Sequence, residues 1–194
     1  MAGGLNKAFK RNPAVFLQTH TLMVNPQAHG SQAIAGGATN IDLVMADNKT
    51  NPKFVRLESY DLRTHGWGAD PIGAYYCPAI VDNYSNIPLG LQAPYMFTPD
   101  LSGCLFAAYG PDASNLTVEH VNVRSAAAAP NLIANRAALA MQSAYYRIVS
   151  PQPLGHNLGP NVVTYATGGN VVGRRVGNNW QFIYRLDQNP VNQF

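Results

Sequence analysis

Short stretches of apolar, β-branched and aromatic residues recur along the chain, and glycine, proline and asparagine residues separate them. This pattern predicts β-strands connected by turns. We expect strands at 18–24, 41–46, 54–60, 94–97, 105–109, 116–123, 162–166, 171–176 and 180–186. The last three are expected to form an antiparallel meander, because glycine- and asparagine-rich turns at 168–170 and 177–179 separate them.

One segment has helical spacing instead. Between residues 131 and 149, apolar side chains recur every three or four positions, and Pro130 and Pro151 flank the segment. We therefore predict a helix over 131–149 whose apolar stripe packs on the core. Segment 65–92 mixes glycine, proline and aromatic residues, and we expect a long loop there. The pattern as a whole predicts a β-rich α+β fold, with residues 1–194 as one domain.

The composition narrows the class of protein. The chain is 46% hydrophobic and only 12% charged, which excludes a disordered protein. Its 13 Lys and Arg residues give a net charge of +3 but are scattered, the densest group being Lys7, Lys10 and Arg11. Because a nucleic-acid-binding surface concentrates such charge on one face, we expect no nucleic-acid partner. No apolar run has the roughly 20 residues of a membrane helix, so we expect no membrane association.

Motifs for metals and cofactors are missing from the sequence. The five histidines are dispersed, and the two cysteines, Cys77 and Cys104, are too far apart to form a zinc-binding pair. The glycine-rich segment 168–175 ends in Arg-Arg, where a phosphate-binding loop has Lys followed by Ser or Thr. We therefore expect neither a metal nor an organic cofactor. We interpret both cysteines as reduced thiols, and a single disulfide between them is the alternative.

Cys104 and His120 are the candidates for chemistry. Cys104 follows the polar turn Ser102-Gly103 and begins an apolar strand, and a turn at 110–112 leads into the strand that carries His120. A hairpin folded at that turn brings the two side chains together. An imidazole beside a thiol can take its proton, which creates the thiolate nucleophile, and can later protonate a leaving group. Glu119 is expected on the opposite face of the strand, and Cys77 is expected to be structural.

The segment around Cys104 could also stabilise an acyl-transfer intermediate. Gly103 would let substrate and backbone approach closely, and the backbone N–H groups of the turn formed by Leu101, Ser102 and Gly103 could bind an oxyanion. The other interpretation is that Cys104 and His120 are core residues of a non-catalytic β-sandwich with a binding or structural role.

The motif Leu101-Ser102-Gly103-Cys104, followed by a histidine on a strand, resembles the Cys–His glutamine deamidase toxins. These include the catalytic domain of cytotoxic necrotizing factor and the Burkholderia lethal factor; the chemotaxis receptor glutamine deamidases resemble the motif more distantly. In two branches of the family a threonine six residues before the cysteine completes the site, and Thr98 has that position here. The chain departs from the lethal factor at Pro99-Asp100 and in its longer connection between Cys104 and His120.

The resemblance implies a sandwich of mixed β-sheets surrounded by helices and long loops. It implies a glutamine deamidase in which Cys104 attacks the side-chain amide, His120 moves protons and Thr98 orients His120. The implied partner is a host protein, either a helicase-like translation-initiation factor or a Rho-family GTPase. Transglutamination or proteolysis through the same acyl-enzyme remains open.

The resemblance also implies where such an enzyme acts. The N-terminus lacks the features of a secretory signal. We therefore expect a protein that is secreted or injected into the host cytosol without a classical signal peptide, as bacterial toxins and effectors are. We also expect it to be a monomer. The bacterial cytoplasm is the alternative location.

Overall fold

The computed structural model describes residues 2–23, 37–47, 53–60, 70–123, 129–151, 159–187 and 190–194. Their strands form two sheets, whose orders are β1-β3-β2-β4-β6-β11-β12-β13 and β10-β9-β7-β8-β5. The larger sheet contains β1 (His20–Met23), β2 (Gly37–Asp47), β3 (Lys53–Tyr60), β4 (Ile72–Tyr76), β6 (Tyr95–Phe97), β11 (Gly169–Val176), β12 (Asn179–Leu186) and β13 (Asn192–Gln193). The smaller sheet contains β5 (Asn83–Leu89), β7 (Leu105–Asp112), β8 (Asn115–Asn122), β9 (Tyr145–Ser150) and β10 (Val162–Thr164).

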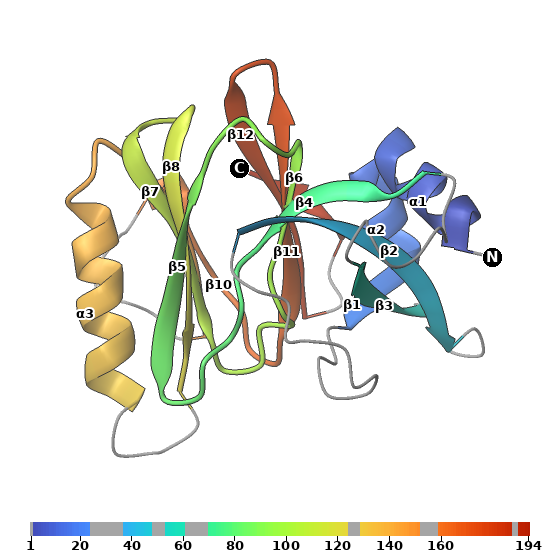
Figure 1. Ribbon diagram of the computed structural model, residues 1–194. Helices are drawn as coiled ribbons and strands as arrows, with labels where there is room; N and C mark the ends of the chain where they lie inside the picture. Colours follow the sequence, from blue (N-terminus) through green and yellow to red (C-terminus); the bar gives the residue numbers. More distant parts are fainter. Residues whose placement is uncertain are drawn as a thin grey trace.

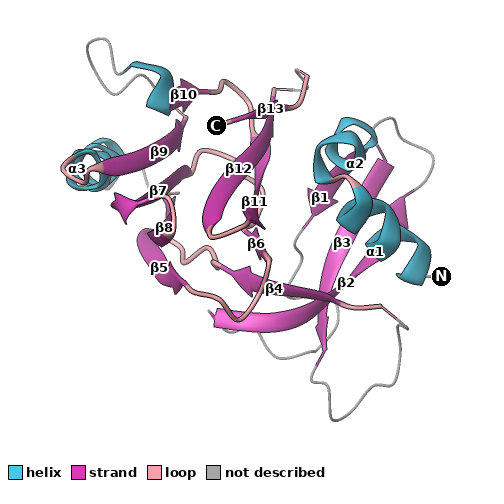
Figure 2. Ribbon diagram, turned by 90° about the horizontal axis from the view of Figure 1, so that it is seen from above, coloured by secondary structure: helices cyan, strands magenta, loops and turns pink. Residues whose placement is uncertain are grey.

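The two sheets form the central layers of the molecule, and helices cover their outer faces (Figures 1 and 2). Helix α3 (Ala129–Met141) packs on the smaller sheet, and α1 (Ala2–Arg11) and α2 (Pro13–Thr19) pack on the larger one. The main core lies between the sheets and includes Phe106, Trp180 and Phe182. Both sheets contain parallel and antiparallel pairs. The expected α+β fold, a β-rich sandwich of mixed sheets, is therefore confirmed.

Two helices at the N-terminus were not predicted. In α1, Leu5 and Phe9 lie one turn apart and face the larger sheet, where Phe9 is fully buried. Asn12 caps α2, because its side chain accepts a hydrogen bond from the N–H of Val15, and Pro13 occupies the first turn, where no N–H is needed. A short connection therefore joins the helices and lets both cover the same sheet.

Three of the local predictions are wrong. The helix expected over 131–149 ends at Met141, because Tyr145–Ser150 pairs with β7 as strand β9. The loop expected over 65–92 contains β4 and β5, and its part 65–69 lies outside the described residues. The last three strands form no meander: β11 and β12 are an antiparallel hairpin, but β10 belongs to the other sheet, where it pairs in parallel with β9.

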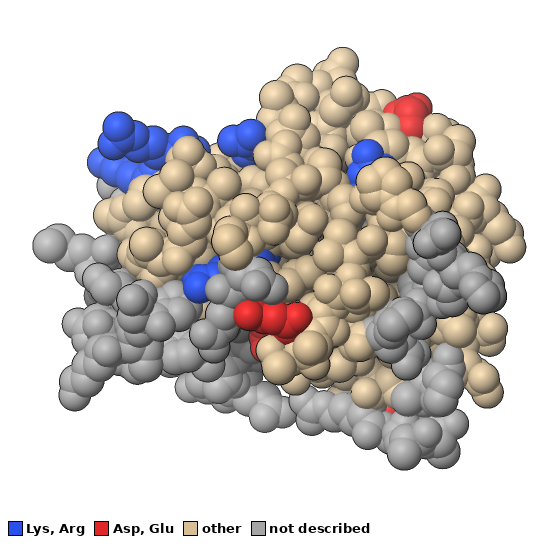
Figure 3. Space-filling view, turned by 180° about the vertical axis from the view of Figure 1, so that it is seen from behind, with Lys and Arg blue, Asp and Glu red and all other residues tan. Residues whose placement is uncertain are grey.

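The surface matches the low charge of the composition. Figure 3 shows mostly uncharged side chains, with the largest basic group over α1 and a few isolated basic residues elsewhere. None of the described helices has both the length and the apolar character needed to cross a membrane.

Candidate active site

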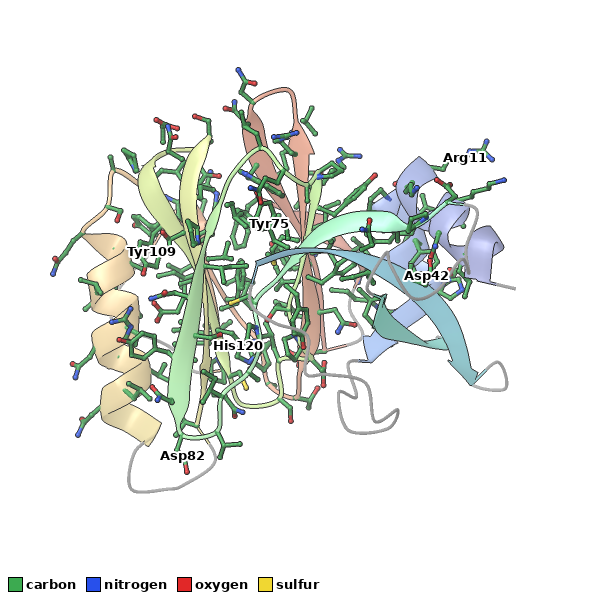
Figure 4. All side chains as sticks on the ribbon, in the orientation of Figure 1. Arg11, Asp42, Tyr75, Asp82, Tyr109 and His120 are labelled. Carbon is green, nitrogen blue, oxygen red and sulfur yellow. The ribbon has the colours of Figure 1, made fainter. Side chains whose placement is uncertain are left out.

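The hairpin of β7 and β8 positions Cys104 and His120. Its strands are antiparallel, with Leu105 opposite Val121 and Phe106 opposite His120, and the chain turns at residues 113–114. Cys104, which precedes β7, therefore lies beside Asn122. Side chains alternate along strands, so Cys104, His120 and Asn122 share the face that points toward the larger sheet. The expected hairpin is present, with His120 on the diagonal from Cys104, and Figure 4 shows His120 between the sheets.

The larger sheet supplies the contact that holds His120. Thr98 follows β6, is 2% exposed, and its Oγ1 lies 2.5 Å from Nδ1 of His120. The structure thus brings together two candidates that lie 22 positions apart in the sequence. If Nδ1 carries the proton, it donates to Oγ1, and Nε2 keeps a lone pair that can accept another proton.

The other nitrogen of His120 has a different environment. Nε2 is buried, and among the described residues it has no hydrogen-bond partner. The side chain is fully buried, and this burial lowers the pKa of His120 from 6.5 to about 4. His120 is therefore a neutral imidazole at pH 7. An unpaired buried nitrogen on a neutral ring is available to accept a proton from a thiol.

Cys104 is almost completely buried, with 4% of its surface exposed. Its Sγ lies 3.5 Å from Oδ1 of Asn122 and 3.8 Å from the carbonyl oxygen of Ser102. Sequence analysis did not find Asn122, although strand alternation places it on the His120 face. A substrate can reach Sγ only if residues around the thiol move.

The turn before Cys104 has a conformation that requires glycine. Gly103 has φ of 79°, whereas a Cβ added there would meet no atom within 4 Å. This left-handed backbone is the conformation that glycine adopts without strain. Ser102 is exposed, but Leu101 is fully buried, and its N–H donates to the carbonyl of Gly169 at 2.8 Å. Leu101 therefore anchors the turn, and its N–H is not available to an oxyanion.

A second turn, at 165–169, supports the first one. The hydroxyl of Tyr165 donates to the carbonyl oxygen of Cys104 at 2.6 Å. The carboxylate of Asp187 accepts hydrogen bonds from the N–H groups of Ala166, Thr167 and Gly168 at 2.6–3.1 Å. These N–H groups lower the pKa of Asp187 to about 2. The position of the candidate nucleophile therefore depends on a segment more than 60 residues further along the chain, which no local motif could reveal.

The second cysteine lies in the same core but in a different environment. The N–H of Cys77 donates to the carbonyl of Phe97, and its Sγ lies 3.4 Å from Oγ of Ser85. Burial raises the pKa of Cys77 to about 11. Such a thiol is protonated at neutral pH, as expected for a structural cysteine.

Glu119 lies on the other face of β8, as expected. Its carboxylate is 1% exposed and forms two hydrogen bonds with the guanidinium of Arg136 from α3, one of them at 2.7 Å. The hydroxyl of Tyr109 donates to the same carboxylate at 3.1 Å. Glu119 therefore binds α3 to the sheet and does not contact His120.

A surface cavity and the candidate site lie at different ends of the β7–β8 hairpin. A surface cavity of about 520 Å³ lies at the opposite end of the hairpin, beside Tyr109, Gly110 and Leu116, and includes none of the candidate residues. Within the described residues, no three His, Cys, Asp or Glu side chains gather as metal ligands would.

Comparison with known proteins gives a likeness of fold. No protein-family model matches the chain, and no curated protein sequence matches it. Among solved structures, the fold is similar to the C-terminal domain of CNFy from Yersinia pseudotuberculosis, with a TM-score of 0.52 and 9% sequence identity. The similarity covers 100% of this chain and 97% of that one. At this identity, the two chains share a fold.

Proposed function

We propose that this protein is a glutamine deamidase that converts a glutamine of another protein to glutamate and releases ammonia. The observation that carries the proposal is the state of His120: Thr98 holds one ring nitrogen, and the other is buried, without a partner among the described residues, on the face that carries Cys104. The resemblance of the segment around Cys104 to the Cys–His glutamine deamidase toxins adds support, and the whole chain has a fold similar to that of the C-terminal domain of CNFy.

The first half of the reaction forms a thioester. Nε2 of neutral His120 takes the proton of the Cys104 thiol while Sγ attacks the carbon of the substrate carboxamide. The carbon–nitrogen bond then breaks, and the proton on His120 passes to the nitrogen, which leaves as ammonia. The N–H groups of Ser102 and Gly103 are the proposed oxyanion donors, without Leu101.

The second half releases the product. Neutral His120 removes a proton from water, which attacks the thioester carbon, and the carbon–sulfur bond breaks to give glutamate and the free thiol. The sum is one water consumed and one ammonia released. Because burial lowers the pKa of His120, the ring is neutral at pH 7 and its Nε2 lone pair can accept the proton. No step needs a metal or an organic cofactor.

The proposed substrate is a host protein, a helicase-like translation-initiation factor or a Rho-family GTPase, reached by secretion or injection. The test is mass spectrometry of a host-cell lysate incubated with the protein or with its Cys104→Ser variant. We expect glutamine-to-glutamate changes and ammonia release only with the unmodified protein. Incorporation of an added amine would indicate a transglutaminase instead, and new chain ends would indicate a protease. If none of these three kinds of change occurs, the result contradicts an enzymatic role for Cys104.

A further inference from the structure

The carboxamide of Asn122 is a third polar group on the Cys104 face of the hairpin. Its Oδ1 lies 3.5 Å from Sγ, and the residue is only 6% exposed. The register explains this contact, because Leu105 pairs with Val121 and extending the two strands by one residue brings Cys104 opposite Asn122. The thiol therefore has an imidazole and an amide on the same face of the neighbouring strand.

In the structure, the amide oxygen accepts a hydrogen bond from the thiol, and this contact stabilises the protonated form of Cys104. The same amide carries two N–H donors on its other arm. A rotation of about 180° around the Cβ–Cγ bond exchanges the positions of Oδ1 and Nδ2. This torsion has a broad, roughly two-fold preference. From one backbone position, Asn122 can therefore accept a hydrogen bond from the thiol with Oδ1 or donate one to the thiolate with Nδ2.

The thiolate needs such a donor more than it would in an open site. Burial excludes most of the water that would solvate a charged sulfur. The same burial disfavours the imidazolium form of His120, so a stable thiolate–imidazolium pair is costly here. A neutral N–H donor lowers the energy of the thiolate without placing a second charge between the sheets.

We propose that Asn122 is a further residue of the active site, which donates an Nδ2–H hydrogen bond to Sγ of Cys104 when the thiol loses its proton. The proton itself moves to Nε2 of His120, and Asn122 only reorients, so no bond of the amide forms or breaks. The inference deepens the proposed function and rests on Cys104 being its nucleophile.

The test is the sign of a change in the pKa of the Cys104 thiol. The alkylation rate of Cys104 with iodoacetamide is measured against pH in the full chain, and peptide mapping separates it from Cys77. We expect Asn122→Ala to raise the midpoint of this profile, so that the rate at pH 7 falls about 3–10-fold, the effect of one hydrogen bond. The midpoint is used because a uniform change in access does not move it.

The opposite result overturns the inference. If Asn122 only accepts from the neutral thiol, its removal lowers the midpoint and the rate at pH 7 rises. An unchanged midpoint overturns it equally. Asn86→Ala is the matched control, because Asn86 is an exposed asparagine on the adjacent strand β5, and it should leave the profile unchanged.

A second pair of variants covers a loss of folding in Asn122→Ala. Asn122→Thr and Asn122→Val have the same shape and suit a strand, but only Thr can donate. We expect a lower midpoint with Thr than with Val, and equal midpoints would overturn the inference. Alkylation uses no protein substrate, so the two proposals fail separately: a lysate without deamidation and a profile that depends on Asn122 would reject the function alone.

Discussion

Glu119 and His120 are neighbours in the sequence, but β8 places their side chains on opposite faces of the sheet. The two side chains also differ in how many of their polar atoms have hydrogen-bond partners. Toward α3, the carboxylate of Glu119 has Arg136 and Tyr109 as partners, and the Arg136 guanidinium also stacks over the ring of Tyr84, 3.9 Å from its centre. In Figure 4, Tyr109 lies on this side of the sheet, and His120 lies between the sheets.

Toward the larger sheet, the polar groups are incompletely paired. His120 has Thr98 at one nitrogen, and within the described part of the chain nothing pairs with the other. Buried polar atoms are almost always satisfied, because an unsatisfied one costs free energy. The paired carboxylate on the α3 face therefore contributes to stability, whereas the unpaired nitrogen on the other face is the group that the proposed reaction uses.

Removing His120 and Glu119 in turn tests the difference between the two faces. We expect His120→Ala to fold and to lower ammonia release by about 10²–10⁴-fold, because an acid–base group is lost. Ammonia release is measured at equal folded concentration, with Cys104→Ser as the inactive reference. Near-normal turnover in a folded His120→Ala protein would remove His120 from the mechanism.

Glu119→Gln should do the reverse. It leaves the Arg136 guanidinium, whose side chain is 16% exposed, without its charged partner, and we expect a loss of about 3 kcal/mol in the free energy of unfolding. Activity per folded molecule should not change. Denaturant titration measures the loss, and Glu119→Leu combined with Arg136→Leu should restore most of it. A stable Glu119→Gln protein with low activity would contradict the division between the faces.

The pH dependence of stability tests whether His120 is buried as a neutral ring. The pKa of His120 is about 4 in the folded protein and 6.5 when unperturbed, so between these values the unfolded chain binds the extra proton. Stability is therefore complete above pH 6.5 and falls as the pH drops to 4, by about 3 kcal/mol. Unfolding titrations across this window should show the slope in the parent protein. They should show a smaller slope in His120→Ala, and equal slopes would mean that His120 is not buried as a neutral ring.

Thr98→Val has the smallest expected effect. Valine keeps the shape and removes the hydroxyl that holds Nδ1, so turnover should fall about tenfold; stability should fall as well, because the buried Nδ1 loses its partner. Steady-state ammonia release gives the comparison. Thr117→Val, a threonine at the far end of β8, is the matched control. Equal activity in the parent protein, Thr98→Val and Thr117→Val would show that the Thr98 hydroxyl does not orient His120.

The hairpin could be predicted from the sequence because its determinants are local. Alternating strands and a polar turn fix which face carries Cys104 and His120, and the same alternation would have revealed Asn122. The contact of Thr98 with His120 crosses between the sheets, so only the family resemblance suggested it. Tyr165 and Asp187 left no local signal, because their partners are 61 and about 20 residues away.

The errors in secondary structure have the same origin. Residues 145–150 continue the helical spacing of α3, but two tyrosines, Ile148 and Val149 favour a strand, and pairing with β7 decides the outcome. In α1, two glycines obscured the spacing of Leu5 and Phe9, and burial against the larger sheet provides the stability that helix propensity does not. Tertiary contacts therefore decided the elements that the pattern left ambiguous.

The dependence of the Cys104 turn on Asp187 has a consequence for the order in which the protein is made. Thr98, Cys104 and His120 emerge from the ribosome long before the segment that holds the Cys104 turn in position. Until Asp187 has emerged and β12 has paired with β11, the carbonyls and N–H groups that fix the turn have no partners. A nascent or truncated chain that lacks Asp187 thus carries every candidate side chain without the hydrogen bonds that hold the turn at 165–169.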